Sequence, residues 1–141
     1  DQISRLVQGG ALAPLGVKAT ETVKNALAGV KMVFIESNYD EDMLAGGKYP
    51  FLLKKRIASN KGHLSNKQSL ELARFLYDSG TRCFVLSHIS ENNNTYELAF
   101  SNYVDYFEKN NIKLNEDVFV RVSFQGKRGN NFNLKEEYDG K

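Results

Sequence analysis

The sequence predicts an α/β (α+β) fold in which a sheet is flanked by helices. Two short segments, 30–35 and 82–87, are mostly apolar, as buried parallel strands are. Segments with helical spacing of apolar residues surround them, in the order helix–strand–helix–helix–strand–helix–strand. Strands that alternate with helices in this way are typical of a helix-covered sheet. Because there are no repeats and no clear linker, we expect one domain or part of one.

The first predicted helix begins after Thr20, a possible N-cap, and ends at Gly29. Its apolar residues recur at i, i+3 and i+4: Val23, Ala26 and Leu27. The strand 30–35 follows and ends in a polar cluster at 36–40. A second helix is predicted at Pro50, which suits a first helical turn, with an apolar side formed by Phe51, Leu52, Leu53 and Ile57.

A third helix can be capped by Ser65 or Asn66 and stops at Gly80. Its apolar side consists of Leu70, Leu72, Ala73, Leu76 and Tyr77. The strand 82–87 then ends in a second polar cluster, 88–94, which contains three consecutive asparagines.

A fourth helix is predicted over 95–109, and the alternating segment 118–124 reads as a half-exposed edge strand. Residues 1–15 show no periodicity and form an atypical N-terminal segment. The tail 125–141 is rich in Gly, Asn and Lys and is expected to be only partly ordered. The predicted domain therefore covers 16–124.

The composition, 41% hydrophobic and 26% charged, is typical of a globular protein. A net charge of +2 is too small to indicate nucleic-acid binding by itself. No apolar run approaches the roughly 20 residues of a membrane span, and the first ten residues lack a signal-peptide core. The single cysteine, Cys83, allows no internal disulfide, so we expect a cytoplasmic protein. Because apolar residues follow it at 84–86, we interpret Cys83 as a buried strand residue and not as a reactive thiol.

The only two histidines, His63 and His88, lie near the predicted strand ends. In α/β sheets, ligands bind beyond the carboxyl ends of the strands. A histidine held at such an end can present a ring nitrogen to a metal or substrate. The alternative is that each histidine only bonds a backbone carbonyl.

Glu36 follows the first buried strand directly. Its carboxylate is either solvated at the rim of the sheet or buried and paired. A buried Glu–His pair beside a metal is a sensible proton relay for hydrolysis.

A basic stretch, Lys54, Lys55 and Arg56 with Lys61, leads into His63. Such a stretch is either a solvated helix face or a set of phosphate contacts that guide a nucleic acid. Asn93, between two other asparagines, can likewise be a simple turn residue.

Taken together, these segments resemble the C-terminal half of the YycJ/WalJ-like metallo-β-lactamase-fold hydrolases from about Gly16 to Val122. Several unrelated motifs recur in the right order, which makes the resemblance specific. They are Ile35-Glu36-Ser37-Asn38-Tyr39-Asp40, Met43-Leu44, Gly47-Lys48-Tyr49-Pro50, Leu53-Lys54-x-Arg56-Ile57, Gly62-His63-Leu64-Ser65-Asn66 and Leu86-Ser87-His88-Ile89-Ser90-x-x-Asn93.

The resemblance implies half of an αββα sandwich, one mixed sheet with helices, and a one- or two-metal site holding zinc or manganese. It also implies a nuclease or phosphodiesterase with exonuclease-like action on DNA. His88 is then the last metal-ligand histidine. By similarity to ribonuclease Z, Glu36 and His63 form the proton relay. Asn66 and Asn93 match positions near the site, where they are expected to contact substrate.

Two departures bear on activity. The family's His-x-His-x-Asp-His motif and a further histidine are absent, and Pro14 stands where a metal-bridging Asp is expected. Catalytic zinc sites use about three protein ligands, and the resemblance supplies one, so we expect weak or no metal binding and no hydrolysis by the chain alone. We therefore expect a truncated or frame-shifted fragment. An upstream coding segment with the missing motif would confirm this hypothesis, and an intact gene start before Asp1 would contradict it. Such a fragment would be modestly stable and prone to self-association through an exposed sheet face.

The alternative function is a non-catalytic module, either a degenerate family member or a nucleic-acid-binding domain that uses the basic stretch. Metal content, and the salt dependence of DNA binding, distinguish the two functions.

Overall fold

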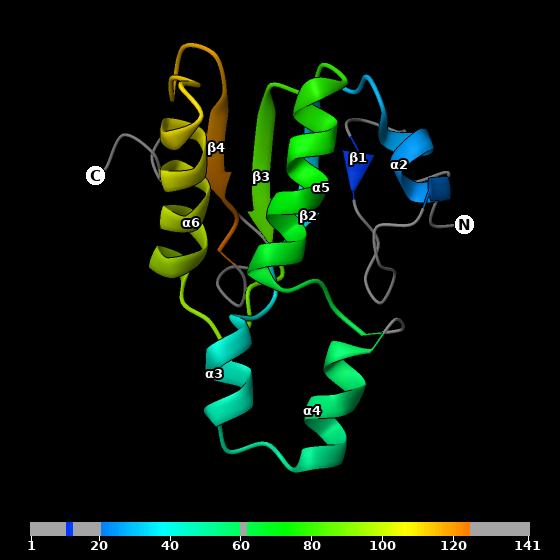
Figure 1. Ribbon diagram of the computed structural model, residues 1–141, viewed down its shortest axis with the longest axis vertical. Coiled ribbons are helices and arrows are strands. Elements are labelled where there is room, and N and C mark those ends of the chain that lie inside the picture. The colour runs from blue at the N-terminus through cyan, green and yellow to red at the C-terminus, as the bar shows by residue number, and fades with distance from the viewer. Residues whose placement is uncertain (1–10, 13–20, 60–61, 125–141) are drawn as a thin grey trace.

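The computed structural model describes residues 11–12, 21–59 and 62–124 (Figure 1). Along the chain its elements are β1 Ala11–Leu12, α2 Glu21–Leu27, β2 Met32–Glu36, α3 Glu41–Gly46, α4 Phe51–Ala58, α5 Asn66–Asp78, β3 Cys83–Ser87, α6 Tyr96–Lys109 and β4 Phe119–Val122. The predicted helices and strands are all present within a few residues of their expected bounds. Thr20, Lys61 and Pro14 lie outside the described residues, as does nearly all of the predicted N-terminal segment and tail.

The four strands form one sheet in the order β1-β2-β3-β4, and every neighbouring pair is parallel. The predicted α/β class is confirmed, but the expectation of a mixed sheet is wrong for these strands. The reason is that helices connect β2 to β3 and β3 to β4, which returns the chain to the same end of the sheet each time. As predicted, β4 lies at an edge of the described sheet.

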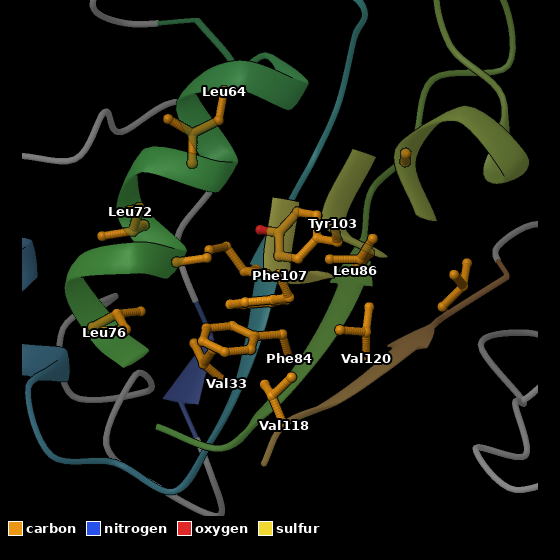
Figure 2. Close-up of a cluster of buried hydrophobic side chains, with 14 of the residues drawn as sticks. Val33, Leu64, Leu72, Leu76, Phe84, Leu86, Tyr103, Phe107, Val118 and Val120 are labelled. Carbon is orange, nitrogen blue, oxygen red and sulfur yellow. The ribbon is translucent and has the colours of Figure 1, made fainter. Parts of the chain in front are cut away.

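One face of this sheet is covered by α2, α5 and α6, which pack on it to form the core (Figure 2). Sheet residues of the core include Val33, Ile35, Phe84, Leu86 and Val120, and the large helix residues include Leu72, Leu76, Tyr103 and Phe107. Alternation along the strands explains this layer, because every second side chain points to the same face.

The apolar side chains at the alternate strand positions do not belong to that core. They are Met32, Phe34, Cys83, Val85 and Phe119, of which all but Val85 are partly exposed. Burial raises the pKa of the Cys83 thiol, so it stays protonated at neutral pH. Self-association through this face, which sedimentation would detect, stays a prediction.

Two features were missed by the sequence analysis. The strand β1 arises within the segment that shows no periodicity, and two residues are too few to carry a pattern. The helix α3 begins after Asp40, whose side chain accepts a hydrogen bond from the Met43 N–H at 3.0 Å. The predicted cap of α5 is confirmed, because Ser65 and Gln68 form a reciprocal capping box. None of the helices in the described part of the chain has the length and apolarity needed to cross a membrane.

Replacing Tyr103 by Phe is expected to cost about 1 kcal/mol of unfolding free energy. The buried Tyr103 hydroxyl lies 2.6 Å from Ser69 Oγ, linking α6 to α5. Burial raises its pKa above the ordinary 10.0, so its stabilising effect is present below pH 10 and is lost as the pH rises further. Urea unfolding of Y103F should therefore show a shallower alkaline loss of stability. Tyr49→Phe, which removes a hydroxyl at the surface, is the control.

Candidate metal centre

Three side chains that are far apart in sequence meet at the carboxyl end of the sheet. Glu36 is the last residue of β2, and its register partner Ser87 immediately precedes His88. His63 lies in the loop that leads into α5. Because β2 and β3 are neighbouring parallel strands, residues at their carboxyl ends must be close, which is why the sequence could predict this cluster.

The Glu36 carboxylate is the centre of the cluster and is only 1% exposed. Its Oε2 lies 2.6 Å from His63 Nδ1 and 2.9 Å from His88 Nδ1. Its Oε1 accepts a hydrogen bond from the Leu64 N–H at 3.0 Å. The interpretation of Glu36 as a solvated rim residue is therefore excluded, and both histidines bond Glu36 through a ring nitrogen.

These contacts fix the tautomers of the two imidazoles. A carboxylate only accepts, so each histidine donates its Nδ1–H to Glu36. In the neutral ring, Nε2 then carries the lone pair that a metal ion or a proton can use. Asn38 Nδ2 lies 3.3 Å from His88 Nδ1 but 2.7 Å from the His88 carbonyl oxygen, so the carbonyl is its acceptor.

The backbone of His88 is held in an unusual conformation. Its φ is +57°, in the left-handed region that non-glycine residues rarely adopt. Two hydrogen bonds with Asn38 stabilise this turn. The Asn38 side chain donates to the His88 carbonyl, and the Asn38 backbone carbonyl accepts the Ser90 N–H at 2.8 Å. Asn38 was not predicted as a site residue, although it lies two residues after Glu36 in the polar cluster.

Glu36, His63 and His88 form a group that could hold a metal ion, with one potential ligand atom from each lying within 4.8 Å of the others. Two ligands of the same tetrahedral zinc lie roughly 3.3 Å apart, given bonds of about 2.0–2.1 Å. The 2.6 Å contact of Glu36 with His63 is instead a hydrogen-bond length. The donor set thus fits a metal ion faced by imidazoles that a carboxylate orients.

His63 and His88 stand in nearly equivalent relations to Glu36. Their rings stack with centroids 5.2 Å apart and an angle of 27°. The assignment of His88 to the metal and of His63 to the proton relay stays a prediction, because each ring has the same carboxylate partner.

A buried polar network holds the loops around the cluster. Ser37 Oγ donates to Asn66 Oδ1 at 2.6 Å, and the side chains of Asn66 and Asn94 bond each other at 2.9 and 3.0 Å. Asn94 also donates to the Ser37 carbonyl at 3.0 Å. These bonds tie the loop after β2, the start of α5 and the loop before α6 together. Asn94 is a second residue that the sequence analysis did not identify.

The two asparagines predicted to contact substrate are both buried. Asn66 and Asn93 are each 3% exposed, and the Asn66 amide is occupied by its network. The backbone of Asn93 bonds Ser90 Oγ and Asp40 N. Substrate contact requires an accessible group, so the structure favours a positioning role for these residues.

The basic stretch lies on α4, outside the cluster. Lys54 Nζ donates to the Ala45 carbonyl at 2.8 Å, while Lys55 and Arg56 are exposed. Within the described residues, the contacts of Lys54 and Lys55 are with Ala45 and Phe51 and not with the cluster, although α4 ends at Ala58, shortly before His63. Their role in binding a nucleic acid stays a prediction.

Curated proteins of two bacteria are similar to this chain. It is 37% identical over 81 residues to exodeoxyribonuclease YycJ of Bacillus anthracis, which covers 57% of the chain and 30% of that protein. It is 35% identical over 86 residues to exodeoxyribonuclease WalJ of Streptococcus pneumoniae strain D39, or 61% of the chain and 32% of that protein. The chain thus spans about a third of the length of these relatives.

No protein-family model matches the chain, and no solved structure matches it. The identity of 35–37% to the curated relatives extends over 57–61% of this chain, so the resemblance to YycJ/WalJ-type proteins that the motifs predict is confirmed.

Proposed function

We propose that this chain supplies the Glu36–His63–His88 cluster to a metal-dependent nuclease of the metallo-β-lactamase superfamily that hydrolyses DNA. The observation that carries the proposal is the buried Glu36 carboxylate, which holds two imidazoles by their Nδ1 atoms at the carboxyl end of a parallel sheet. The similarity to two exodeoxyribonucleases supports DNA as the substrate.

A bound zinc or manganese ion would supply a Lewis acid and an activated water. His88 is the residue proposed to hold the ion through Nε2, with Glu36 fixing the orientation of its ring. His63 and Glu36 form the proposed proton relay. A proton taken up on His63 Nε2 places its charge beside the Glu36 carboxylate, 2.6 Å from Nδ1, which compensates that charge in a buried setting.

The cluster is only part of such a site. The one proposed ligand, His88, is fewer than the roughly three protein ligands of a catalytic zinc, and the similar proteins are about three times as long as the matched region. We infer that the remaining ligands are supplied by a region equivalent to the rest of those relatives. The chain alone is expected to bind metal weakly and not to hydrolyse DNA.

A chimera tests this proposal. The part of the Bacillus anthracis relative that precedes its matched region is fused before residue 16, and release of nucleotides from linear DNA is measured with manganese. The chimera should be active, and His88→Ala should lower the rate at least 100-fold, because it removes a proposed ligand. Lys113→Ala, an exposed change beyond α6, is the control.

A folded, metal-loaded chimera without nuclease activity would contradict the proposal, as would full activity of H88A. If the chimera does not fold, nitrogen-15 spectra of the chain during a zinc titration give a second readout. The proposal then requires zinc to shift the histidine Nε2 signals, and titration at Nδ1 would oppose it.

The second candidate is a non-catalytic nucleic-acid-binding module. The exposed Lys55 and Arg56 on α4 favour it. DNA binding with a steep salt dependence, together with a metal-free and inactive chimera, would support this candidate over the nuclease.

A further inference from the structure

The helices α3 and α4 lie beyond the end of the sheet at which β2 and β3 finish (Figure 1). Residues of both helices line a groove. Its volume is about 600 Å³, within the range of small-molecule sites. Its lining includes Tyr39, Glu41, Phe51, Lys54, Lys55 and Ala58. We call it the α3–α4 groove.

One face of α4 forms a wall of this groove. Successive helix residues are rotated by about 100°, so positions i, i+3, i+4 and i+7 share a face. Phe51, Lys54, Lys55 and Ala58 have this spacing and all line the groove. Leu52 and Arg56 lie on a different face and do not line it.

The wall combines an exposed aromatic ring with positive charge. The Phe51 side chain is 72% exposed, which is rare for phenylalanine, and Lys55 Nζ lies 5.9 Å from the centre of its ring. Lys54 Nζ reaches across to the Ala45 carbonyl on α3. Among the described residues that line the groove, one is acidic: Glu41, which accepts a hydrogen bond from the Ser65 hydroxyl at 3.0 Å.

The same two chain segments build the groove and the metal cluster. Tyr39 lines the groove and lies three residues after Glu36. The His63 N–H donates to the carbonyl of Ile57, in the last turn of α4, at 2.9 Å. A ligand in the groove is therefore held by elements that are fixed to Glu36 and His63.

We propose that the α3–α4 groove binds single-stranded DNA, with a base stacked on Phe51 and the adjacent phosphates at Lys54 and Lys55. This inference rests on the proposed nuclease function and names the form of its substrate. An aromatic ring beside cations is the combination that binds unpaired bases and their phosphates, whereas a duplex hides its base faces in the stack. The link to His63 favours DNA over a membrane or a protein partner, neither of which needs to be near the cluster.

Fluorescence anisotropy with a labelled ten-nucleotide poly-dT tests the inference on the full chain in EDTA, so that hydrolysis plays no part. Phe51→Ala should weaken binding at least fivefold, because the stacking surface is lost. Leu52→Ala is the matched control: it removes a 77% exposed side chain from the other face of the same helix and should change binding less than twofold. K54Q/K55Q should weaken binding and reduce its salt dependence, while Lys113→Gln should not.

Several results would overturn the inference: no detectable binding, equal affinity for a hairpin duplex, or equal losses in F51A and L52A. Binding to anionic phosphatidylglycerol vesicles that F51A and L52A both abolish would instead assign α4 to a membrane surface. Loss of a dimer in F51A, seen by sedimentation, would assign the groove to a contact between copies. A chimera that lacks nuclease activity, with stacking on Phe51 retained, would reject the proposed function alone.

Discussion

Replacing Glu36 by Ala is expected to lower the free energy of unfolding by about 2–3 kcal/mol. Three N–H donors lose their acceptor, and the Leu64 N–H has no access to water because Leu64 is 1% exposed. The side chains of His63 and His88 are 29% and 37% exposed, so water can partly replace the carboxylate, and the cost is below that of a fully buried ion pair. Urea unfolding measures the difference.

The Glu36→Gln variant separates stability from the tautomer argument. Glutamine keeps an oxygen for the Leu64 N–H but presents an amide donor toward the histidines. An imidazole next to that donor must accept at Nδ1 and carry its proton on Nε2, where it can no longer bind a metal. We expect E36Q to be folded, with nitrogen-15 spectra showing the Nε2–H tautomer and zinc affinity reduced at least tenfold.

The control for both variants is Glu91→Gln, an exposed residue in the loop after β3. It should leave the unfolding free energy, the tautomers and the zinc affinity unchanged. An E36Q protein whose histidines keep the Nδ1–H tautomer would show that Glu36 does not orient them. An E36A protein as stable as the unchanged chain would show that the carboxylate bonds contribute nothing net.

Much of this cluster could be predicted because its geometry follows from topology. Two neighbouring parallel strands bring their carboxyl ends together. Glu36 therefore lies beside Ser87, and His88 follows Ser87 directly. His63 was also expected near a strand end, but its specific pairing with Glu36 rested on the resemblance. That Glu36 bonds both imidazoles was not predicted, because the shared acceptor depends on the conformation of the loop that carries His63.

The supporting residues could not be predicted for a related reason. Asn38 and its hydrogen-bond acceptor His88 are 50 residues apart in the sequence, and Asn94 and Ser37 are 57 apart. No local sequence pattern therefore indicates either contact. Asn66 was expected to contact substrate. It is buried instead, because the first residue of α5 packs against the loop after β2 and the loop before α6. A run of asparagines looks the same in sequence whether it forms an exposed turn or a buried network.

Gly62→Ala is expected to destabilise the chain by about 2–4 kcal/mol and to displace His63. An added Cβ would overlap the Ile57 carbonyl oxygen and would lie 2.5 Å from that of Arg56, both of which are backbone atoms that cannot rotate away. The Ile57 carbonyl is also the acceptor of the His63 N–H. Relief of the clash must therefore unwind the end of α4 or move His63 away from Glu36.

Residue 62 must be glycine because there is no room for a Cβ atom, and not because of its backbone conformation. A second glycine provides the control. Gly46, at the end of α3, would have no atom within 4 Å of an added Cβ, so Gly46→Ala should be neutral or stabilising by up to about 1 kcal/mol. Urea unfolding gives the stability of both variants, and nitrogen-15 spectra report the His63–Glu36 bond. Equal stability of G62A and G46A, with the His63 signals unchanged, would mean that the contact between α4 and His63 is not tight. In the expected case G62A loses the His63–Glu36 bond and G46A keeps it, because an added Cβ at residue 62, unlike one at residue 46, meets the backbone at the end of α4.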